Sequence, residues 1–201
     1  MIIDFRTIDK NYEYKQAFFS DSIGSTMSMI KKCEKENGIV TYTGFYDYFK
    51  KVCDKSKVLK HYNIALKFIK TKFPDIKLNE IEKQWAEHFK HRVIIQSVDG
   101  HTNELDAITF LQDSYGLKVT HAGKEKDVNY AVDLETSKFA IQVKPITYKS
   151  KTNKNKELQK TKQNILLLHK KYETKFLKPV YFIYYDSNKK GFDLTDIKYS
   201  K

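Results

Sequence analysis

The chain has 201 residues, of which 40% are hydrophobic and 14% aromatic, so it can bury a sizeable core and is not expected to be disordered. Its 37 lysine and arginine residues outnumber its 25 aspartate and glutamate residues, giving a net charge of +12; this favours a polyanionic partner such as nucleic acid, although an AT-rich coding bias produces the same composition. Cys33 and Cys53 have no disulfide-framework or zinc-ligand spacing, and no stretch resembles a signal peptide or a membrane span, so we expect a cytoplasmic protein with no membrane contact.

The first half of the chain is predicted to be helical. Apolar and aromatic residues recur at helical spacing between residues 11 and 89, including a face of residues 78–89 that carries Trp85 and Phe89. The expected breaks between helices are Gly24, Gly38, Gly44 and Pro74. His88 and His91 lie on adjacent faces of one helix without an acidic or thiol partner, so they do not indicate a metal site.

A further helix is expected at residues 104–115. Leu105, Ile108 and Leu111 form an apolar stripe, and Gly116 stands in the usual position just after a helix end. In this interpretation Glu104 opens the helix, where it either interacts favourably with the helix dipole or serves a catalytic site.

The second half changes to the alternation that is typical of strands. Residues 117–121, 129–135 and 139–148 are rich in β-branched and aromatic side chains, and residues 179–186 and 191–197 are expected to form a further strand pair. A lysine-rich amphipathic helix falls between these two groups. We therefore predict an α/β fold with a mixed sheet flanked by helices, organised as a helical region, residues 1–99, and an α/β core, residues 100–201.

The strands at residues 129–135 and 139–148 are expected to form a hairpin. A two-residue turn at residues 136–137 pairs Asp133 with Ala140. Because opposed residues share a face, as do alternate residues of one strand, this register places Asp133, Gln142 and Lys144 together on one face. A three-residue loop would break this register, so the inference depends on the turn.

A carboxylate, an amide oxygen and an ammonium group on one face can hold Mg²⁺ beside a scissile phosphate. Oxygen ligands suit this hard cation, and a lysine can stabilise negative charge and orient or deprotonate an attacking water. The predicted chemistry is phosphodiester hydrolysis. Taken singly, Asp133, Gln142 and Lys144 are also ordinary residues of a hairpin surface, and Asp127 and Glu135 nearby are expected to be solvated.

The string D-x8-QVK, from Asp133 to Lys144, resembles the PD-(D/E)xK nuclease motif, with Gln142 in place of the second acid and Val132 in place of the proline. The similarity covers residues 100–186. The stretches VIIQSVDGHTNELDAITFL, DVNYAVDL and IQVKPITYK further resemble small type II restriction endonucleases, most of all the MjaI-type family.

This resemblance implies a restriction-endonuclease-like mixed sheet flanked by helices, Mg²⁺ as cofactor with Mn²⁺ as a substitute, and a short CTAG-like palindrome as target. It also places a glutamate on the helix before the motif, the position of Glu104. The predicted catalytic residues are Asp133, Gln142, Lys144 and Glu104. The predicted metal ligands are Asp133, Gln142, Glu104 and the carbonyl of Val143.

The basic stretch at residues 149–162 directly follows the catalytic strand. Lysines there can neutralise phosphates, and asparagine and glutamine can bind adenine edges in the major groove; a solvated linker is the alternative. The predicted DNA-contacting residues are Lys149, Lys151, Asn153, Lys154, Asn155 and Gln163.

The sequence thus predicts a metal-dependent type II restriction endonuclease that cleaves double-stranded DNA. Dimerisation is expected because a palindrome has two-fold symmetry and each strand needs one active site. The alternatives are a sequence-tolerant Mrr-like or junction-resolving nuclease and a non-catalytic DNA-binding regulator.

Overall fold

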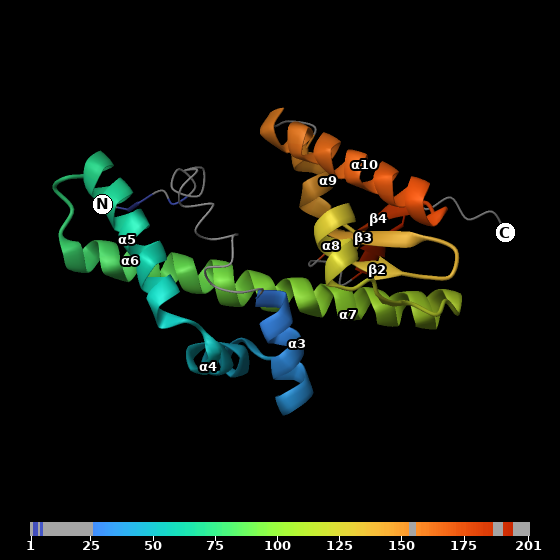
Figure 1. Cartoon of the computed structure of the whole chain (residues 1–201), viewed down its shortest axis with the longest axis horizontal. Coiled ribbons are helices and arrows are strands. Elements are labelled where there is room, and N and C mark those ends of the chain that lie inside the picture. The colour runs from blue at the N-terminus through green and yellow to red at the C-terminus, as the bar shows by residue number, and fades with distance from the viewer. Residues whose placement is uncertain (1, 4, 6–25, 153–155, 187–190, 195–201) are drawn as a thin grey trace. The chain divides into compact units, whose positions relative to one another are not determined.

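The structure is a computed structural model that describes residues 2, 3, 5, 26–152, 156–186 and 191–194 (Figure 1). The chain divides into two compact units, Met1–His101 and Thr102–Lys201. Helix α7 (Gln96–Tyr115) contains the point of division. The helical prediction for residues 11–25 lies outside the described residues.

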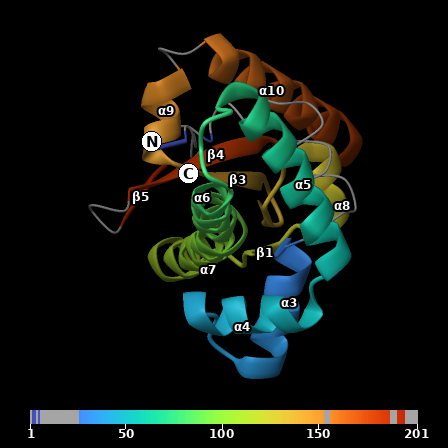
Figure 2. The same ribbon diagram turned by 90° about the vertical axis from the view of Figure 1, so that its left-hand side faces the viewer.

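The first unit is helical. It contains α3 (Thr26–Asn37), α4 (Tyr42–Val52), α5 (Lys55–Lys72) and α6 (Leu78–Lys90), followed by a π-helical turn, η1 (His91–Ile95), that leads into α7. Helices α3 and α4 lie side by side (Figure 2). Gly44 lies inside α4, so the predicted break there is wrong: Thr41 caps the helix by accepting the Gly44 N–H at 3.0 Å, which stabilises the first turn around the glycine.

The core of the first unit is built from the apolar faces of these helices. Phe49 of α4 lies 6.1 Å from Phe89 of α6, and Phe89 lies 4.9 Å from Trp85, measured between ring centroids. All three side chains are buried. The helical periodicity of residues 78–89 therefore predicted correctly that Ile81, Trp85 and Phe89 pack inward, whereas Leu78, which the same periodicity places on this face, is exposed.

The second unit is built on a five-stranded sheet in the order β1-β2-β3-β4-β5. The strands are β1 (Thr120–His121), β2 (Leu134–Glu135), β3 (Ala140–Pro145), β4 (Val180–Asp186) and β5 (Gly191–Asp193). Strands β3 and β4 pair in parallel, whereas the other neighbours are antiparallel. The mixed sheet flanked by helices confirms the predicted fold class.

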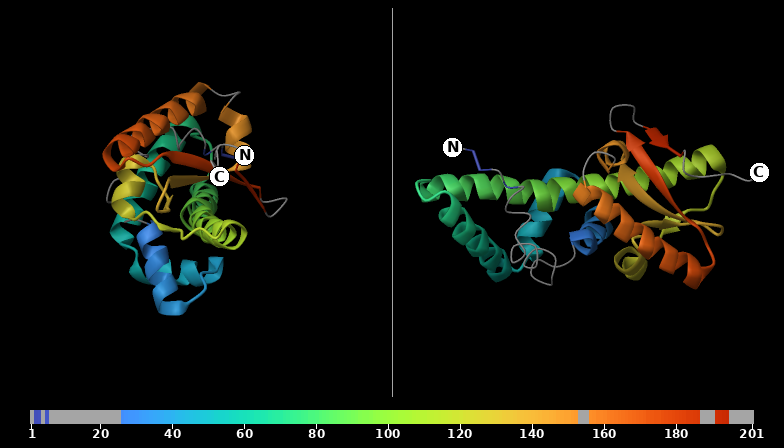
Figure 3. Two further views of the ribbon diagram at one scale, coloured as in Figure 1. Left: turned by 90° about the vertical axis from the view of Figure 1, so that its right-hand side faces the viewer. Right: turned by 90° about the horizontal axis from the view of Figure 1, so that it is seen from above.

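Helices cover both faces of this sheet (Figure 3). On one face, Leu111 of α7 packs with Ile141 of β3 and Ile183 of β4. On the other face lie α8 (Lys124–Tyr130), α9 (Ile146–Thr152) and α10 (Lys156–Phe176), where Tyr172 of α10 packs with Ala140 of β3. The parallel pair β3 and β4 is connected through α9 and α10. Within the described part of the chain, no helix is long and apolar enough to cross a membrane.

Several predicted boundaries are wrong. The helix expected to begin at Glu104 begins eight residues earlier, at Gln96, because it continues the helical path of α6 and η1. Most of the strand predicted at residues 129–135 is replaced by the end of α8, a left-handed residue, Ala131 at φ 55°, and the two-residue strand β2. The third expected strand ends at Pro145, and α9 begins at the next residue, Ile146. Tertiary packing overrides β propensity at these positions.

Candidate active site

Asp133 lies immediately before β2 and is fixed by the backbone on both sides. Its N–H donates to the carbonyl of Ile141 at 2.9 Å, and its own carbonyl accepts the N–H of Ala122 at 3.0 Å. Its carboxylate Oδ2 accepts the N–H of Val143 in β3 at 2.8 Å. The acidic group is therefore held against the strand that carries Gln142 and Lys144.

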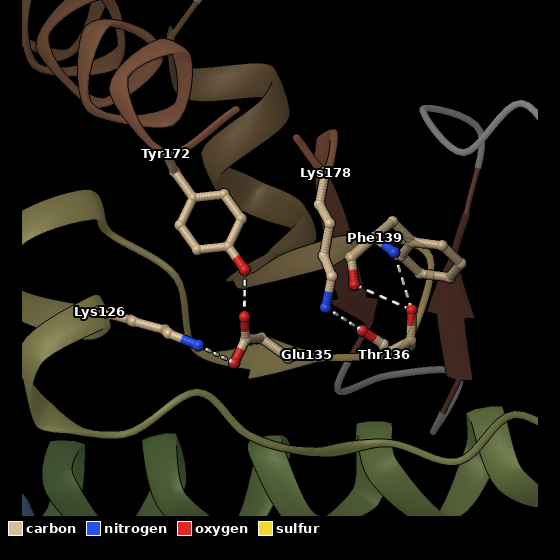
Figure 4. Close-up of polar contacts among 6 residues, drawn as sticks. All are labelled: Lys126, Glu135, Thr136, Phe139, Tyr172 and Lys178. Atoms are coloured by element: carbon tan, nitrogen blue, oxygen red, sulfur yellow. Dashed lines mark hydrogen bonds and ion pairs between the residues drawn. The ribbon is translucent and has the colours of Figure 1, made fainter. Parts of the chain in front are cut away.

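The register of the hairpin differs from the prediction. Glu135 is paired with Ala140, so the loop comprises residues 136–139 and the predicted pairing of Asp133 with Ala140 is wrong. Thr136 closes this longer loop: its Oγ1 accepts the Phe139 N–H at 2.9 Å and donates to the Phe139 carbonyl at 2.9 Å (Figure 4). The backbone N–H of Thr136 donates to the same carbonyl at 2.8 Å. The register shifts by two residues, which moves Asp133 toward Val143 along β3.

The second strand of the hairpin has the expected alternation. Ile141 and Val143 belong to the apolar cluster on the α7 side of the sheet, and Ala140 packs on the α10 side. Gln142 and Lys144 alternate with Ile141 and Val143, so they lie on the α10 side of β3. In the parallel register they stand beside Phe182 and Tyr184 of β4.

The environment of Asp133 disfavours its negative charge. Burial raises the pKa of the carboxyl group to about 7, the Lys144 ammonium opposes this rise, and Glu104 adds to it; the Val143 N–H lowers the pKa and Asp127 raises it. Lys144 and Glu104 are thus close enough to act on Asp133 electrostatically. A carboxylate in this situation is stabilised in its ionised form when a cation is added beside it.

Gln142 supplies a buried oxygen that lacks a partner. The residue is 4% exposed, and its Oε1 has no hydrogen-bond partner among the described residues. Because a buried acceptor without a partner is costly, such an atom indicates a missing ligand, ion or water. This oxygen fits the role of a neutral ligand to a hard cation such as Mg²⁺.

Glu104 lies inside α7 rather than at its beginning, and its Oε2 is 3.2 Å from Nδ1 of His121 in β1. The Glu104 side chain is 14% exposed. Sequence reasoning missed His121, which no motif marks; the pair forms only when β1 is placed beside α7. One carboxylate oxygen of Glu104 thus has a histidine partner.

The oxygen groups around Asp133 fit Mg²⁺ as a partial set of ligands rather than as a complete coordination shell made by the protein. Among the residues that the structure describes, no group of three His, Cys, Asp or Glu side chains is arranged to hold a metal ion. Asp133, Glu104 and the amide oxygen of Gln142 instead offer a small set of oxygens, and Mg²⁺ commonly takes its remaining ligands from water and substrate phosphate. The Val143 carbonyl remains a predicted ligand.

The predicted DNA-contacting residues are only partly described. Lys149 lies in α9, and its ammonium is 3.2 Å from Oδ2 of Asp193. Gln163 is exposed on α10. Lys151 belongs to α9, but its side chain is outside the description, and Asn153, Lys154 and Asn155 lie outside the described residues. The stretch predicted as a basic segment after the strand is thus partly helical.

Comparison with known proteins gave a family match over nearly the whole chain. The family model described as MjaI restriction endonuclease matches residues 6–199. No curated protein and no solved structure matches the chain. The match covers both units, including the residues around Asp133 and Lys144. The chain therefore belongs to the MjaI restriction endonuclease family.

Proposed function

We propose that this protein is a type II restriction endonuclease that uses Mg²⁺ to hydrolyse both strands of duplex DNA at a short, CTAG-like palindrome. Family membership implies an endonuclease that acts on DNA. The observation that carries the site assignment is the Asp133 carboxyl group, held by the Val143 N–H at 2.8 Å with a pKa raised to about 7. The ionised form of such a carboxyl group is strongly stabilised by a nearby divalent cation.

Asp133 and Glu104 would supply the two acidic oxygens that hold Mg²⁺, and Gln142 would supply the neutral oxygen. A bound Mg²⁺ neutralises charge on the scissile phosphate and makes a nearby water more acidic. The Val143 N–H orients the carboxylate of Asp133. His121 holds one oxygen of Glu104 and so orients this second acidic group.

Lys144 is the cationic group of the site. Its ammonium lies near enough to lower the pKa of Asp133, so it acts on the same small region as the proposed ligands. There it stabilises the negative charge that develops on the phosphate during attack, and it orients or deprotonates the attacking water. Mn²⁺ is expected to replace Mg²⁺ because it accepts the same oxygen ligands.

The remaining parts of the chain have roles in binding. The net charge of +12 favours DNA, whose phosphates attract lysine and arginine. We assign phosphate and base contacts to residues 149–163, and dimer or groove contacts to the helical region, residues 1–99. A homodimer places one active site on each strand of a palindrome.

Digestion of an unmethylated phage genome with Mg²⁺, followed by sequencing of the fragment ends, tests this function. Discrete bands whose 5′-phosphate ends fall at one palindrome are expected. A smear indicates a sequence-tolerant nuclease, and cleavage of branched DNA alone indicates a junction-resolving enzyme. DNA binding without any Mg²⁺- or Mn²⁺-dependent nicking indicates a non-catalytic regulator. Lys144→Ala serves as the control for contaminating nucleases.

A further inference from the structure

Among the described residues, helix α10 donates two hydrogen bonds to residues 131–135, the segment that carries Asp133. Two residues before Asp133, the carbonyl of Ala131 lies 3.2 Å from Nε2 of His169. Two residues after Asp133, the carboxylate of Glu135 accepts a hydrogen bond from the hydroxyl of Tyr172 (Figure 4). His169 and Tyr172 are three residues apart, so they lie on one face of α10.

His169 is a buried and directional contact. It is 3% exposed, and its ring centroid is 5.0 Å from that of Phe182 in β4. Because a carbonyl oxygen can only accept, Nε2 carries the proton and donates it to Ala131. Burial lowers the pKa of His169 and the charge of Lys144 lowers it further, against the raising effects of the Ala131 hydrogen bond and Glu173. The neutral imidazole is therefore favoured.

Tyr172 forms the contact on the other side of Asp133. Its side chain is fully buried, and burial and the bond to Glu135 both raise the pKa of its hydroxyl, which therefore stays protonated and donates. Lys126 of α8 binds the second oxygen of Glu135 at 2.6 Å. The expectation that Glu135 is solvated is thus wrong: its side chain is 14% exposed and both oxygens are bound.

We infer that His169 and Tyr172 are positioning residues that hold residues 131–135 so that the Asp133 carboxylate stays on the Val143 N–H. This inference rests on the proposed function, in which Asp133 is a metal ligand and small displacements of such a ligand lower the cleavage rate. The two contacts bracket Asp133 symmetrically along the chain. Neither His169 nor Tyr172 needs to touch DNA or metal to act in this way.

The test uses variants of the full chain that change one hydrogen bond while keeping the side-chain volume similar. Tyr172→Phe removes the hydroxyl donor, and His169→Leu removes the ring donor. His169→Gln retains an N–H that can reach the Ala131 carbonyl. Tyr130→Phe is the matched control, because Tyr130 belongs to the same aromatic cluster but its hydroxyl bonds to Lys175 instead.

Two quantities are measured: the exchange rate of the Val143 N–H by NMR in metal-free protein, and the single-turnover cleavage rate with saturating Mg²⁺. In Tyr172→Phe and His169→Leu, we expect Val143 exchange to be about tenfold faster, as for the loss of one buried hydrogen bond. Cleavage should be about 10- to 100-fold slower, with DNA binding unchanged. His169→Gln should restore most of both values, and Tyr130→Phe should match the parent.

The outcomes separate this inference from the proposed function. Parent-like Val143 exchange and parent-like cleavage in folded Tyr172→Phe and His169→Leu overturn the positioning role, as do equal losses in the Tyr130→Phe control. If the parent cleaves no DNA but Val143 exchange responds as expected, the proposed function fails and the positioning of Asp133 stands. If Tyr172→Phe does not fold, the comparison of His169→Leu with His169→Gln decides.

Discussion

Asp133→Asn is expected to stabilise the metal-free protein while abolishing cleavage. The pKa of Asp133 is raised from 3.8 to about 7, so the folded protein holds the proton more tightly than the unfolded chain does. The stability contribution of Asp133 is therefore fully present below pH 3.8 and is lost as the pH rises through about 7. At about 1.36 kcal/mol for each pH unit, the loss is at most about 4 kcal/mol.

Asparagine keeps an oxygen that can accept the Val143 N–H but carries no charge. Because Asp133 retains some exposure to solvent, the effect of burial is weakened. We therefore expect Asp133→Asn to raise the free energy of unfolding by about 1–3 kcal/mol at pH 8. The gain should shrink as the pH falls toward 5. Mg²⁺ should raise the stability of the parent and leave the variant unaffected, because the ligand stabilises only the state that binds it.

The assay is urea unfolding of parent and variant in chelator at pH 5, 6.5 and 8, repeated at pH 8 with Mg²⁺, together with plasmid nicking. A variant that is less stable than the parent at pH 8, or a gain that does not change with pH, would refute the assignment of a destabilised carboxylate. A folded variant that nicks DNA at the parent rate would remove Asp133 from the active site.

Four further predictions concern neighbouring groups. Lys144→Ala should slow cleavage at least about 100-fold with DNA affinity nearly unchanged, because it removes charge stabilisation at the phosphate; parallel loss of binding in a gel-shift assay would contradict this. Gln142→Glu should retain cleavage and lower the Mg²⁺ concentration that gives half of the maximal rate, whereas Gln142→Leu should raise the free energy of unfolding and impair cleavage. A Mg²⁺ titration in which Gln142→Leu needs less Mg²⁺ than Gln142→Glu would be incompatible with a ligand role. Burial raises the pKa of Glu135, but the hydrogen bonds from Lys126 and Tyr172 outweigh this effect and hold the pKa below 4.5. The contribution of Glu135 to the free energy of unfolding is therefore present above pH 4.5 and is lost as the pH falls through the pKa of the folded state. In urea unfolding, Glu135→Gln should accordingly be less stable than the parent at pH 6 but not at pH 3. DNA affinity should fall steeply with salt because bound lysines release counterions, and a flat affinity between low and moderate salt would contradict a phosphate-binding surface.

The sequence predicted the strands of the second unit best at β3 and β4, whose central residues are buried. Residues 180–186 are mostly apolar and aromatic, and residues 140–145 alternate Ile141 and Val143 with Gln142 and Lys144; the two segments form the parallel pair β3 and β4. The pattern of residues 78–89 likewise predicted the buried face of α6. In these segments local preference and tertiary packing agree, so the pattern alone is informative.

The same reasoning failed where a turn or a helix junction decides the structure. The Thr136 side chain bonds backbone groups across a four-residue loop, and this stabilises a longer turn than the strand alternation suggested. No break separates α6 from α7 because η1 accommodates a change of hydrogen-bond pattern without ending the helix. Glu104 therefore lies inside α7 rather than at a cap.

The spacing of residues in the sequence could suggest the candidate site around Asp133, but it could not suggest the histidines that contact this site. Asp133, Gln142 and Lys144 are close along the hairpin, so a short-range pattern contains them. His121 of β1 lies 12 residues before Asp133, and His169 of α10 lies 36 residues after it. Their contacts with Glu104 and with the Ala131 carbonyl depend on the complete fold, and single-sequence periodicity carries no signal for them.

Gln142 has a further consequence for the metal-free state of the site. Asp133 already carries a carboxyl group whose ionisation is opposed by burial and by Glu104. A glutamate at position 142, directly before the Val143 N–H that binds Asp133, would place another negative charge in the same region and oppose ionisation further. Glutamine avoids this repulsion but leaves a buried oxygen for which the described part of the chain offers no hydrogen-bond partner. In either case the metal-free folded protein carries a free-energy cost at position 142: charge repulsion with glutamate, and an unmade hydrogen bond with glutamine. In the proposed function, glutamine at position 142 is thus expected to bind Mg²⁺ more weakly than glutamate would, with a smaller electrostatic penalty in the metal-free protein.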